Sequence, residues 1–558
     1  MGYMYLRESK QKRADGSVLS HLQLAENVWD PVKKRSSVRI VYNCGRSEDP
    51  KTAERLRRLA RSILKRCAPE ELAAHDPDLH VVDAWPWGDL YVLEALWRRA
   101  GMPELIAELV DGRQYGFSVE RALFAMIANR ACAPSSKLHC HRQWLSEDVR
   151  IEGCECLDLH HLYRAMDFLE AHKDEIERGL YYRLADLFNL DVELVFYDTT
   201  SLHFEIDEED GGDGGWMDSG TGPGLRKRGK SKNGRSDAPQ VVIGLAVTRD
   251  GFPVRHWVFP GNTVDVTTVA RVKRELRGWQ LSRCVFVGDA GMVSAENLRA
   301  LARGGGRYIM CMPVHRGGEV DREVVSRRGR YHAVAGNLQV KEVVVGEGER
   351  RRRYVVCFNP HETERQRGHR ARVLVELEAQ LAALGGCGAG EHSKRVCALR
   401  SSGRYGKYLR LTRTGRPAID RAAVKAAERM DGKFVVHSND DTLSAADMAL
   451  GYKQLQRAEQ AWRQLKGGLR LRPVHHHAVH RIHAHIALTV IALLLERMAE
   501  HVCGDTWRNI RDDLKGIKLV ELIGPNGAFL QVTEPRPDAS NRLKSLEIPP
   551  PPTILKLG

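Results

Sequence analysis

Residues 193–200 have the sequence ELVFYDTT, an apolar run that leads directly into a carboxylate. The run is typical of a buried β-strand and predicts a strand that ends at Asp198. Strands disfavour aspartate, and a lone carboxylate is costly to remove from water. Asp198 is therefore either a cap or turn residue, with Thr199, Thr200 and Ser201 bonding local backbone groups, or a metal ligand at a strand end.

The chain after this strand predicts a mixed α/β sheet. A Gly-rich tract at about 206–237, acidic first and basic later, predicts a mobile loop. Two apolar runs around Asp250-Gly251 then indicate a β-hairpin. The order β-β-β-α-β-α-β is completed by a helix at 263–279, a strand at 283–289, a helix at 294–303 and a strand at 307–313.

The strand predicted at 283–289 also ends on an aspartate, Asp289. Neighbouring strand ends can bring Asp198 and Asp289 together in such a sheet. Like charges held close need a cation between them or a raised pKa. The repeated pattern predicts a divalent metal site, and two unrelated turn residues are the alternative.

Composition and charge narrow the class of partner. The 558 residues contain 86 Lys plus Arg against 72 Asp plus Glu, a formal net charge of +14. This excess favours a polyanionic partner, with nucleic acid as the first candidate. The apolar run Ile486 to Leu495 is about half the ~20 residues that a membrane span needs, so it predicts a core helix. The N-terminal sequence has no apolar signal region, and we therefore expect a cytoplasmic protein without a membrane segment.

The cysteines and histidines do not predict a structural zinc site. Twelve cysteines lack a repeated CxxC spacing, which indicates reduced thiols. Cys154 and Cys156 with His160 and His161 lack the paired ligand spacing of a zinc site. The histidine-rich segment 475–485 is interpreted as a polar approach to a helix.

Changes in pattern divide the chain into six parts. They are a small β-rich arm at 1–48, a helical, arginine-rich region at 49–190 that is a candidate for DNA contact, the first part of the α/β core at 191–313, an inserted β-rich module at 314–432, the final part of the core at 433–504 and a C-terminal tail at 505–558. The tail has a PPPP run and is either a partner-binding segment or a linker.

The final part of the core predicts one long helix. It begins after Thr442, with Ser444 and Asp447 as a capping box, and continues past Gly451 through 452–473. At ~100° per residue, one narrow arc of this helix contains an acid among cations. The members of this arc are Tyr452, Glu459, Arg463, Lys466 and Arg470. Taken alone, the acid is explained by a surface pair of Glu459 with Arg463, worth about 0.2–0.5 kcal/mol.

The spacing of Tyr452, Glu459 and Lys466 matches a Tyr-x2-Arg-x3-Glu-x6-Lys motif, with Leu455 at the Arg position. Three further segments, YDTTS around Asp198, VGDAG around Asp289 and FPGNTVD at 259–265, occur in the matching order. With these motifs the chain resembles, over roughly 115–500, the DDE transposases of bacterial insertion sequences. The resemblance is to the branch with an inserted β-rich domain.

The resemblance implies a fold, a reaction and a cofactor. The fold is α/β, with a ribonuclease H-like core in which helices flank a mixed sheet. Asp198, Asp289 and Glu459 are implied as the catalytic residues and as the ligands of two Mg²⁺ ions, for which Mn²⁺ substitutes. The reaction is cleavage of DNA at the element ends, followed by strand transfer to target DNA. A nuclease on the same fold and an inactive DNA-binding protein are the alternatives.

The resemblance also implies how DNA is held. The partners are double-stranded DNA, as element inverted repeats and as target, and a second copy of the chain in a homodimer on DNA, so we expect the protein at the bacterial nucleoid. The implied DNA-binding residues are Tyr452, Arg463 and Lys466 on the helix and Lys230, Lys232 and Arg235 in the basic half of the loop. Trp462 is either a base-stacking residue or a core residue.

Overall fold

The computed structural model describes residues 4–13, 18–31, 34–64, 80–188, 193–211, 224–232, 234–279, 284–315, 318–386, 388–524 and 527–555. Residues 212–223 and 233 of the Gly-rich tract therefore lie outside the described residues. The chain divides into two compact units. The first contains Met1–Ala84, Val520–Gln531 and Ile554–Gly558, and the second contains Trp85–Leu519 and Val532–Thr553. Every candidate site residue belongs to the second unit.

The first unit is built from two small sheets and one helix. Its first sheet has the order β1-β2-β3, in the segment where a β-rich arm was predicted. A second sheet, with the order β18-β17-β16-β4, has most of its residues in this unit. The elements are β1 (Met4–Lys12), β2 (Val18–Asp30), β3 (Arg35–Arg46), α1 (Pro50–Leu64), β4 (His80–Pro86), β16 (Lys518–Gly524), β17 (Gly527–Val532) and β18 (Ile554–Leu555).

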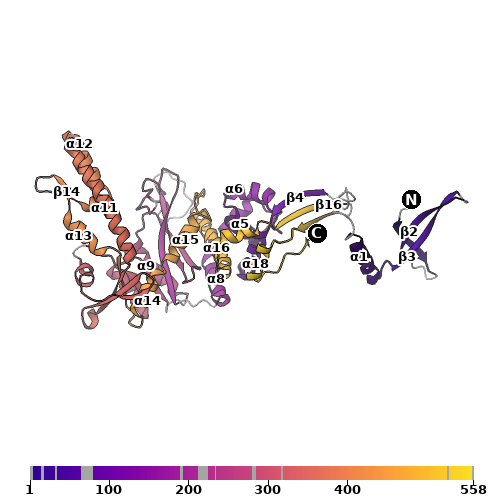
Figure 1. The fold of residues 1–558 in the computed structure, drawn as a ribbon, viewed down its shortest axis with the longest axis horizontal. Helices are drawn as coiled ribbons and strands as arrows, with labels where there is room; N and C mark the ends of the chain where they lie inside the picture. The colour runs from indigo at the N-terminus through magenta and orange to yellow at the C-terminus, as the bar shows by residue number, and fades with distance from the viewer. Residues whose placement is uncertain are drawn as a thin grey trace. The chain divides into compact units, whose positions relative to one another are not determined.

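A nine-stranded mixed sheet organises the second unit (Figure 1). In sheet order the strands are β10 (His332–Ala335), β11 (Leu338–Val345), β12 (Arg352–Phe358), β15 (Lys433–Ser438), β9 (Arg307–Cys311), β8 (Val285–Gly288), β5 (Leu194–His203), β6 (Gln240–Val247) and β7 (Pro253–Pro260). Strand β8 pairs in parallel with β5 and with β9, and the other pairs are antiparallel. With α9 (Asp265–Arg277) and α10 (Ala295–Ala302), the chain order β5-β6-β7-α9-β8-α10-β9 confirms the predicted β-β-β-α-β-α-β order.

Strand β5 does not end at Asp198, contrary to the prediction. It continues to His203, and its antiparallel pairing with β6 runs from Phe196 to His203. Its parallel pairing with β8 stops at Phe196. The β-branched residues Thr199 and Thr200 suit an extended backbone, and β6 satisfies their ladder hydrogen bonds. Asp198 therefore marks the end of one strand pairing and not the end of the strand.

The two faces of the sheet have different covers. On one face, Val195 and Tyr197 of β5 pack with α9 and α10 in a buried apolar core. Side chains alternate along a strand, so Phe196, Asp198 and Thr200 point to the opposite face. That face is covered by α14 (Ala445–Lys453), which packs on β8, β9 and β15, and by α15 (Gln456–Lys466), which packs on β5 and β6.

The single long helix predicted after Thr442 is in fact two helices. The capping box of Ser444 with Asp447 is present at the start of α14. The helix ends at Lys453, and α15 begins at Gln456. Leu455 lies at the break and is buried. Tyr452 and Glu459 are therefore on different helices, and the arc predicted from one continuous helix does not exist.

The module at 314–432 is not β-rich as a whole. Its first half supplies β10, β11 and β12, which extend the main sheet. The part between β12 and β15 is mainly helical and has its own apolar core. Its elements are α11 (Pro360–Ala383), α12 (Ala389–Ser401), the short strands β13 (Leu409–Leu411) and β14 (Pro417–Ile419), and α13 (Arg421–Met430).

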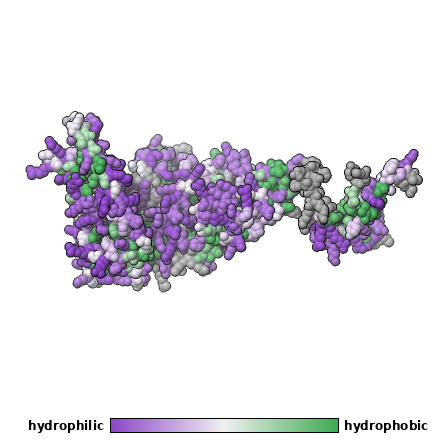
Figure 2. Space-filling view, in the orientation of Figure 1, coloured by the Kyte–Doolittle hydropathy of each residue, from purple (hydrophilic) through white to green (hydrophobic). Residues whose placement is uncertain are grey.

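Helices from both ends of the chain form the remaining part of the second unit. They are α3 (Gly88–Arg99), α4 (Met102–Val110), α5 (Val119–Cys132), α6 (Lys137–His139), α7 (Leu159–Ala171), α8 (Lys173–Leu187), α16 (Val479–Cys503), α17 (Trp507–Leu514) and α18 (Pro537–Ser545). The run Ile486 to Leu495 is buried in α16, as predicted for a core helix. Buried Trp507, Leu514 and Leu543 place the predicted tail in the fold, so a linker role is wrong for α17 and α18. Most of the surface visible in Figure 2 is hydrophilic.

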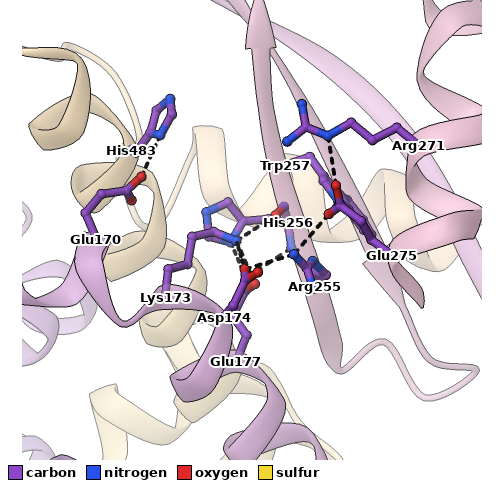
Figure 3. Close-up of polar contacts among 10 residues, drawn as sticks. All are labelled: Glu170, Lys173, Asp174, Glu177, Arg255, His256, Trp257, Arg271, Glu275 and His483. Atoms are coloured by element: carbon purple, nitrogen blue, oxygen red, sulfur yellow. Dashed lines mark hydrogen bonds and ion pairs between the residues drawn. The ribbon is translucent and has the colours of Figure 1, made fainter. Parts of the chain in front are cut away.

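A buried polar network fixes α8 to the edge strand β7 (Figure 3). The Glu177 carboxylate accepts hydrogen bonds from Lys173 Nζ at 2.7 Å and from His256 Nδ1 at 2.5 Å. Arg255, the neighbour of His256 on β7, forms ion pairs with Asp174 at 2.8 Å and with Glu275 of α9 at 3.0 Å. Through this network, α8 covers β7, the edge strand of the sheet, and protects it from pairing with another chain.

Candidate functional site

Asp198 and Asp289 lie at equivalent positions of two neighbouring parallel strands. The pairing of β5 with β8 ends with Phe196 opposite Val287. Two residues further along each chain are Asp198 and Asp289, which puts both on the face that α14 and α15 cover. Asp198 is half-buried, whereas Asp289 is exposed.

The surroundings of Asp198 oppose its ionisation. Burial raises the pKa of Asp198 to about 6, although Lys232 and the Thr199 backbone N–H act in the opposite direction. The charges of Asp289 and Asp265 raise the same pKa further. Two carboxylates thus repel the ionised form of a third, an arrangement that a cation would relieve.

Tyr452 of α14 contacts Asp289, and Lys466 of α15 contacts β5 close to Asp198. The Tyr452 hydroxyl donates a hydrogen bond to Asp289 Oδ1 at 2.9 Å. Lys466 Nζ donates to Thr200 Oγ1 at 2.5 Å, two residues beyond Asp198 on the same strand. Burial and Arg472 lower the pKa of Lys466, while the charge of Asp198 acts against them. Tyr452 and Lys466, two of the three residues that match the motif, therefore border the candidate site.

Asp265 is a site residue that the sequence analysis did not assign. It lies in the first turn of α9, and its Oδ1 accepts a hydrogen bond of 2.6 Å from the Thr199 hydroxyl. Lys232 Nζ forms an ion pair with Asp265 Oδ2 at 2.9 Å and donates to the Thr199 carbonyl at 2.8 Å. This contact ties the loop, the helix and β5 together beside Asp198. The sequence signal was the aspartate at the end of FPGNTVD, which alone is equally typical of a helix start.

Glu459 is exposed in the first turn of α15. Among the residues that the structure describes, one group of three metal-ligand side chains has its ligand atoms within 4.8 Å of one another, and it is Asp158, His160 and His161. Asp198, Asp289 and Glu459 therefore do not form a group this close in the structure. Glu459 lies seven residues before Lys466, so the two side chains share one face of α15.

The remaining predicted DNA-binding residues differ in their surroundings. Lys230 and Arg463 are exposed. Arg235 forms ion pairs with Glu205 at 3.2 Å and with Asp237 at 3.1 Å, so acids already balance its charge. Trp462 is buried, which makes it a core residue of α15.

The donor set of the candidate site suits a hard divalent cation. Asp198, Asp289 and Glu459 offer only carboxylate oxygens, which Mg²⁺ and Mn²⁺ prefer over nitrogen or sulfur ligands. The charges of Asp289 and Asp265 add to burial in raising the pKa of Asp198, and a bound cation would lower it. The residues therefore fit the ion that the motifs imply.

Comparison with known proteins gives the family. The family model of the transposase DDE domain matches residues 212–495, slightly more than half of the chain. This range contains Asp289 and Glu459 and begins after Asp198. A second model, the N-terminal domain of IS1634 family transposases, matches residues 6–75. No curated protein matches the chain. Among solved structures, a piggyBac transposase synaptic complex with hairpin DNA matches at 8% identity and a TM-score of 0.35, covering 77% of this chain and 79% of that chain.

The protein belongs to the DDE transposases. The match at its N-terminus identifies it further as a transposase of the bacterial insertion-sequence type. As an enzyme of this family it acts on DNA and depends on a divalent metal, and the cleavage-only nuclease and the inactive binding protein are not favoured. No helix in the described part of the chain is long and apolar enough to cross a membrane.

Proposed function

We propose that β5 to β9, with α9, α10, α14 and α15, form a ribonuclease H-like catalytic core with Asp198, Asp289 and Glu459 as its carboxylates. The observation that carries the proposal is the register of β5 and β8, which aligns Asp198 with Asp289 at one end of a parallel pair. The contact of α15 with β5 and β6 supports Glu459 as the third member.

The three carboxylates would hold two Mg²⁺ or Mn²⁺ ions. When bound, such ions supply an activated water and stabilise the departing 3′ oxygen of a phosphodiester. The Tyr452 hydroxyl orients the Asp289 carboxylate through its hydrogen bond. Lys466, held beside Asp198 by Thr200, offers a positive charge for a DNA phosphate at the reacting bond.

The 3′ hydroxyl that cleavage frees is itself the nucleophile for joining to target DNA. No side chain of the protein needs to form a covalent bond to DNA. Lys230 and Arg463, which are exposed, are proposed to contact the DNA backbone, and Lys232 to hold the loop beside the site. We further propose that two copies of the chain act together on a pair of element ends.

The test is metal-dependent cleavage and joining of labelled DNA that carries the inverted repeats flanking the gene. Asp198→Asn, Asp289→Asn and Glu459→Gln should each bind this DNA and lose cleavage by at least about 100-fold, since loss of even an outer-shell partner of a metal ligand costs about 10–100-fold. Glu364→Gln is the control, because Glu364 is exposed on α11 and pairs there with Arg367. It should cut like the parent.

Two results would contradict the proposal in different ways. Full activity of Glu459→Gln would remove Glu459 from the site and leave the two aspartates in place. Asp440, which accepts hydrogen bonds from Arg307 and Thr442, and the buried Glu496 would then be tested next. Binding of the repeats without cleavage under either metal would refute a catalytic role for all three carboxylates.

A further inference from the structure

A hollow of about 540 Å³ lies beside the candidate catalytic residues. We call it the basic pocket, and it is lined by residues 203–206, Arg226, Lys466 and residues 472–477. Its wall begins at His203, the last residue of β5, so it continues along the strand that carries Asp198. Lys466 belongs both to this wall and to the candidate site, where it contacts Thr200.

Arg472 gives the wall of the basic pocket its positive charge. Its Nη1 lies 3.2 Å from His203 Nδ1, and among the described residues it has no carboxylate partner. His203 Nε2 in turn lies 3.3 Å from Glu205. Glu205 is the single acid in the wall, and Arg235 pairs with it at 3.2 Å. Arg235 thus balances the charge of Glu205. The charge of Arg472 is not balanced by an acid in the wall.

Behind the wall, four basic side chains are packed together. The rings of His476, which lines the pocket, and of His485 have centroids 5.6 Å apart. His485 is 2% exposed, and Arg130 and Lys137 are each 4% exposed. These four residues form what we call the buried basic cluster. They come from α5, α6, α16 and the segment before α16, so several elements are needed to assemble it.

Within the described ranges, no carboxylate forms an ion pair with a member of the buried basic cluster, and Arg130 donates only to the backbone carbonyls of Arg470 and Ser135. His485 Nδ1 and Arg130 Nε are buried without a hydrogen-bond partner. Burial, followed by the charge of Lys137, lowers the pKa of His476 to about 3. Burial and Arg130 lower the pKa of Lys137 to about 7, and no carboxylate acts on either group. Burial without an acid disfavours the charged forms of these groups, and a bound anion would favour them.

We propose that the basic pocket binds a backbone phosphate of the DNA strand that passes Asp198, with Arg472 at its wall and His476 at its floor. The proposal rests on the proposed function only in that the DNA strand passes the carboxylates. The volume is within the ~300–1,000 Å³ typical of sites that enclose a small ligand, which leaves room for the attached nucleoside beside Phe204. Imidazole and guanidinium N–H groups are suitable donors to phosphate oxygens.

The test measures binding alone, in protein that carries Asp198→Asn. Labelled inverted-repeat DNA is prepared with each phosphate near the cut replaced in turn by an uncharged methylphosphonate. One or two adjacent replacements should weaken binding about tenfold, the effect of losing one charge-assisted contact. Adding Arg472→Gln should weaken binding of unmodified DNA by a similar factor and make those same replacements harmless.

Arg367→Gln is the matched control, since Arg367 is exposed on α11 and pairs with Glu364. It should keep the methylphosphonate pattern of the parent. An unchanged pattern in the Arg472→Gln protein would overturn the proposal. Because no cleavage is measured, this result is independent of whether the three carboxylates are catalytic.

Lys137→Met provides a second variant that does not depend on the wall. Loss of this buried amino group should raise the Tm and yet weaken DNA binding about threefold or more, at the low end for an ordinary hydrogen bond. A raised Tm with unchanged DNA binding would refute the role of the cluster. The last measurement uses inorganic phosphate, which should compete with DNA for the pocket. If phosphate stabilises the parent protein but does not compete with DNA, the anion that the pocket binds is not a DNA phosphate.

Discussion

A raised carboxyl pKa does not by itself mark the catalytic centre of this transposase. Burial raises the pKa of Asp198 to about 6, in a site with two further aspartates. Burial and Glu500 raise the pKa of Glu496 to about 8, but Glu496 is 4% exposed within α16, among core helices. Burial is the first cause of the raised pKa in both carboxylates. Only the residues around each one distinguish a candidate catalytic carboxylate from a carboxylate of the core.

Glu496 gives a prediction about stability and pH. Its pKa is 4.5 in the unfolded chain and about 8 in the folded protein, so the unfolded chain ionises first as the pH rises. Stability is therefore lost between about pH 4.5 and pH 8. Glu496→Gln removes this loss and should stabilise the protein by more than about 1 kcal/mol at pH 8 and by little at pH 5.

Thermal unfolding at the two pH values measures this difference. Glu364→Gln, at an exposed position, should show the same pH profile as the parent. An equal effect of Glu496→Gln at pH 5 and pH 8 would mean that packing of the amide, and not loss of the charge, explains it.

The placement of Asp198 and Asp289 on neighbouring strands could be predicted from the sequence, but the contacts around them in the candidate site could not. Asp198 and Asp289 each follow an apolar run, which is a local signal. The contact of Thr199 with Asp265 joins residues that are 66 positions apart. Only the folded sheet brings such pairs together, so no local pattern indicates them.

At the scale of the elements, the predictions failed where tertiary contacts override a local pattern. The end of β5 was set at Asp198 because aspartate disfavours strands, but pairing with β6 continues to His203. The helix after Ser444 was expected to be continuous, since its pattern has no proline before Pro473. It breaks at Leu455, whose side chain is buried at the point where α14 gives way to α15.

The network between α8 and β7 leads to a prediction about unfolding. Burial alone would raise the pKa of Glu177, but Lys173 and His256 lower it to about 2. Its stabilising effect is thus present above pH 4.5 and lost as the pH falls toward 2. Glu177→Gln removes the buried carboxylate that Lys173 and His256 share and should cost about 3–5 kcal/mol at pH 7.

Urea unfolding at pH 7 measures this cost. Asp174→Asn is the control on the same helix, because the Asp174 side chain is 64% exposed although it pairs with Arg255 (Figure 3). It should cost no more than about 1 kcal/mol. Equal costs for the two variants would show that burial of the Glu177 pair has no special weight.

At the scale of the whole molecule, the two ends of the helical insertion join the sheet side by side. Phe358 of β12 pairs with Lys433 of β15. Asn359 follows Phe358 and Gly432 precedes Lys433, and the Asn359 N–H donates a backbone hydrogen bond of 2.8 Å to the Gly432 carbonyl. Everything from Pro360 to Asp431 thus leaves the sheet and returns to it between two neighbouring residues.

This attachment predicts that the insertion can be removed. Joining Asn359 directly to Gly432 creates an Asn-Gly turn between two paired strands, which is a favoured hairpin connection. The shortened protein should fold with its main sheet intact and unfold cooperatively. It loses the ion pair of Arg429 with Asp321, at 3.0 Å, as one of its contacts to the rest.

Circular dichroism and limited proteolysis of the shortened protein provide the measurement. Deletion of α16 is the control and should abolish folding, because this helix is part of the core. Failure of the Asn359–Gly432 protein to fold would show that the insertion is part of the folding unit of the sheet.

The aligned ends of β5 and β8 have a consequence for how such a chain can change in length. Gain or loss of one residue between Leu194 and Asp198, or between Val285 and Asp289, would rotate one aspartate to the opposite side of its strand. Insertions in the connecting segments would leave that alignment untouched. Among natural relatives, we therefore expect length differences to accumulate between these strands, with none inside them.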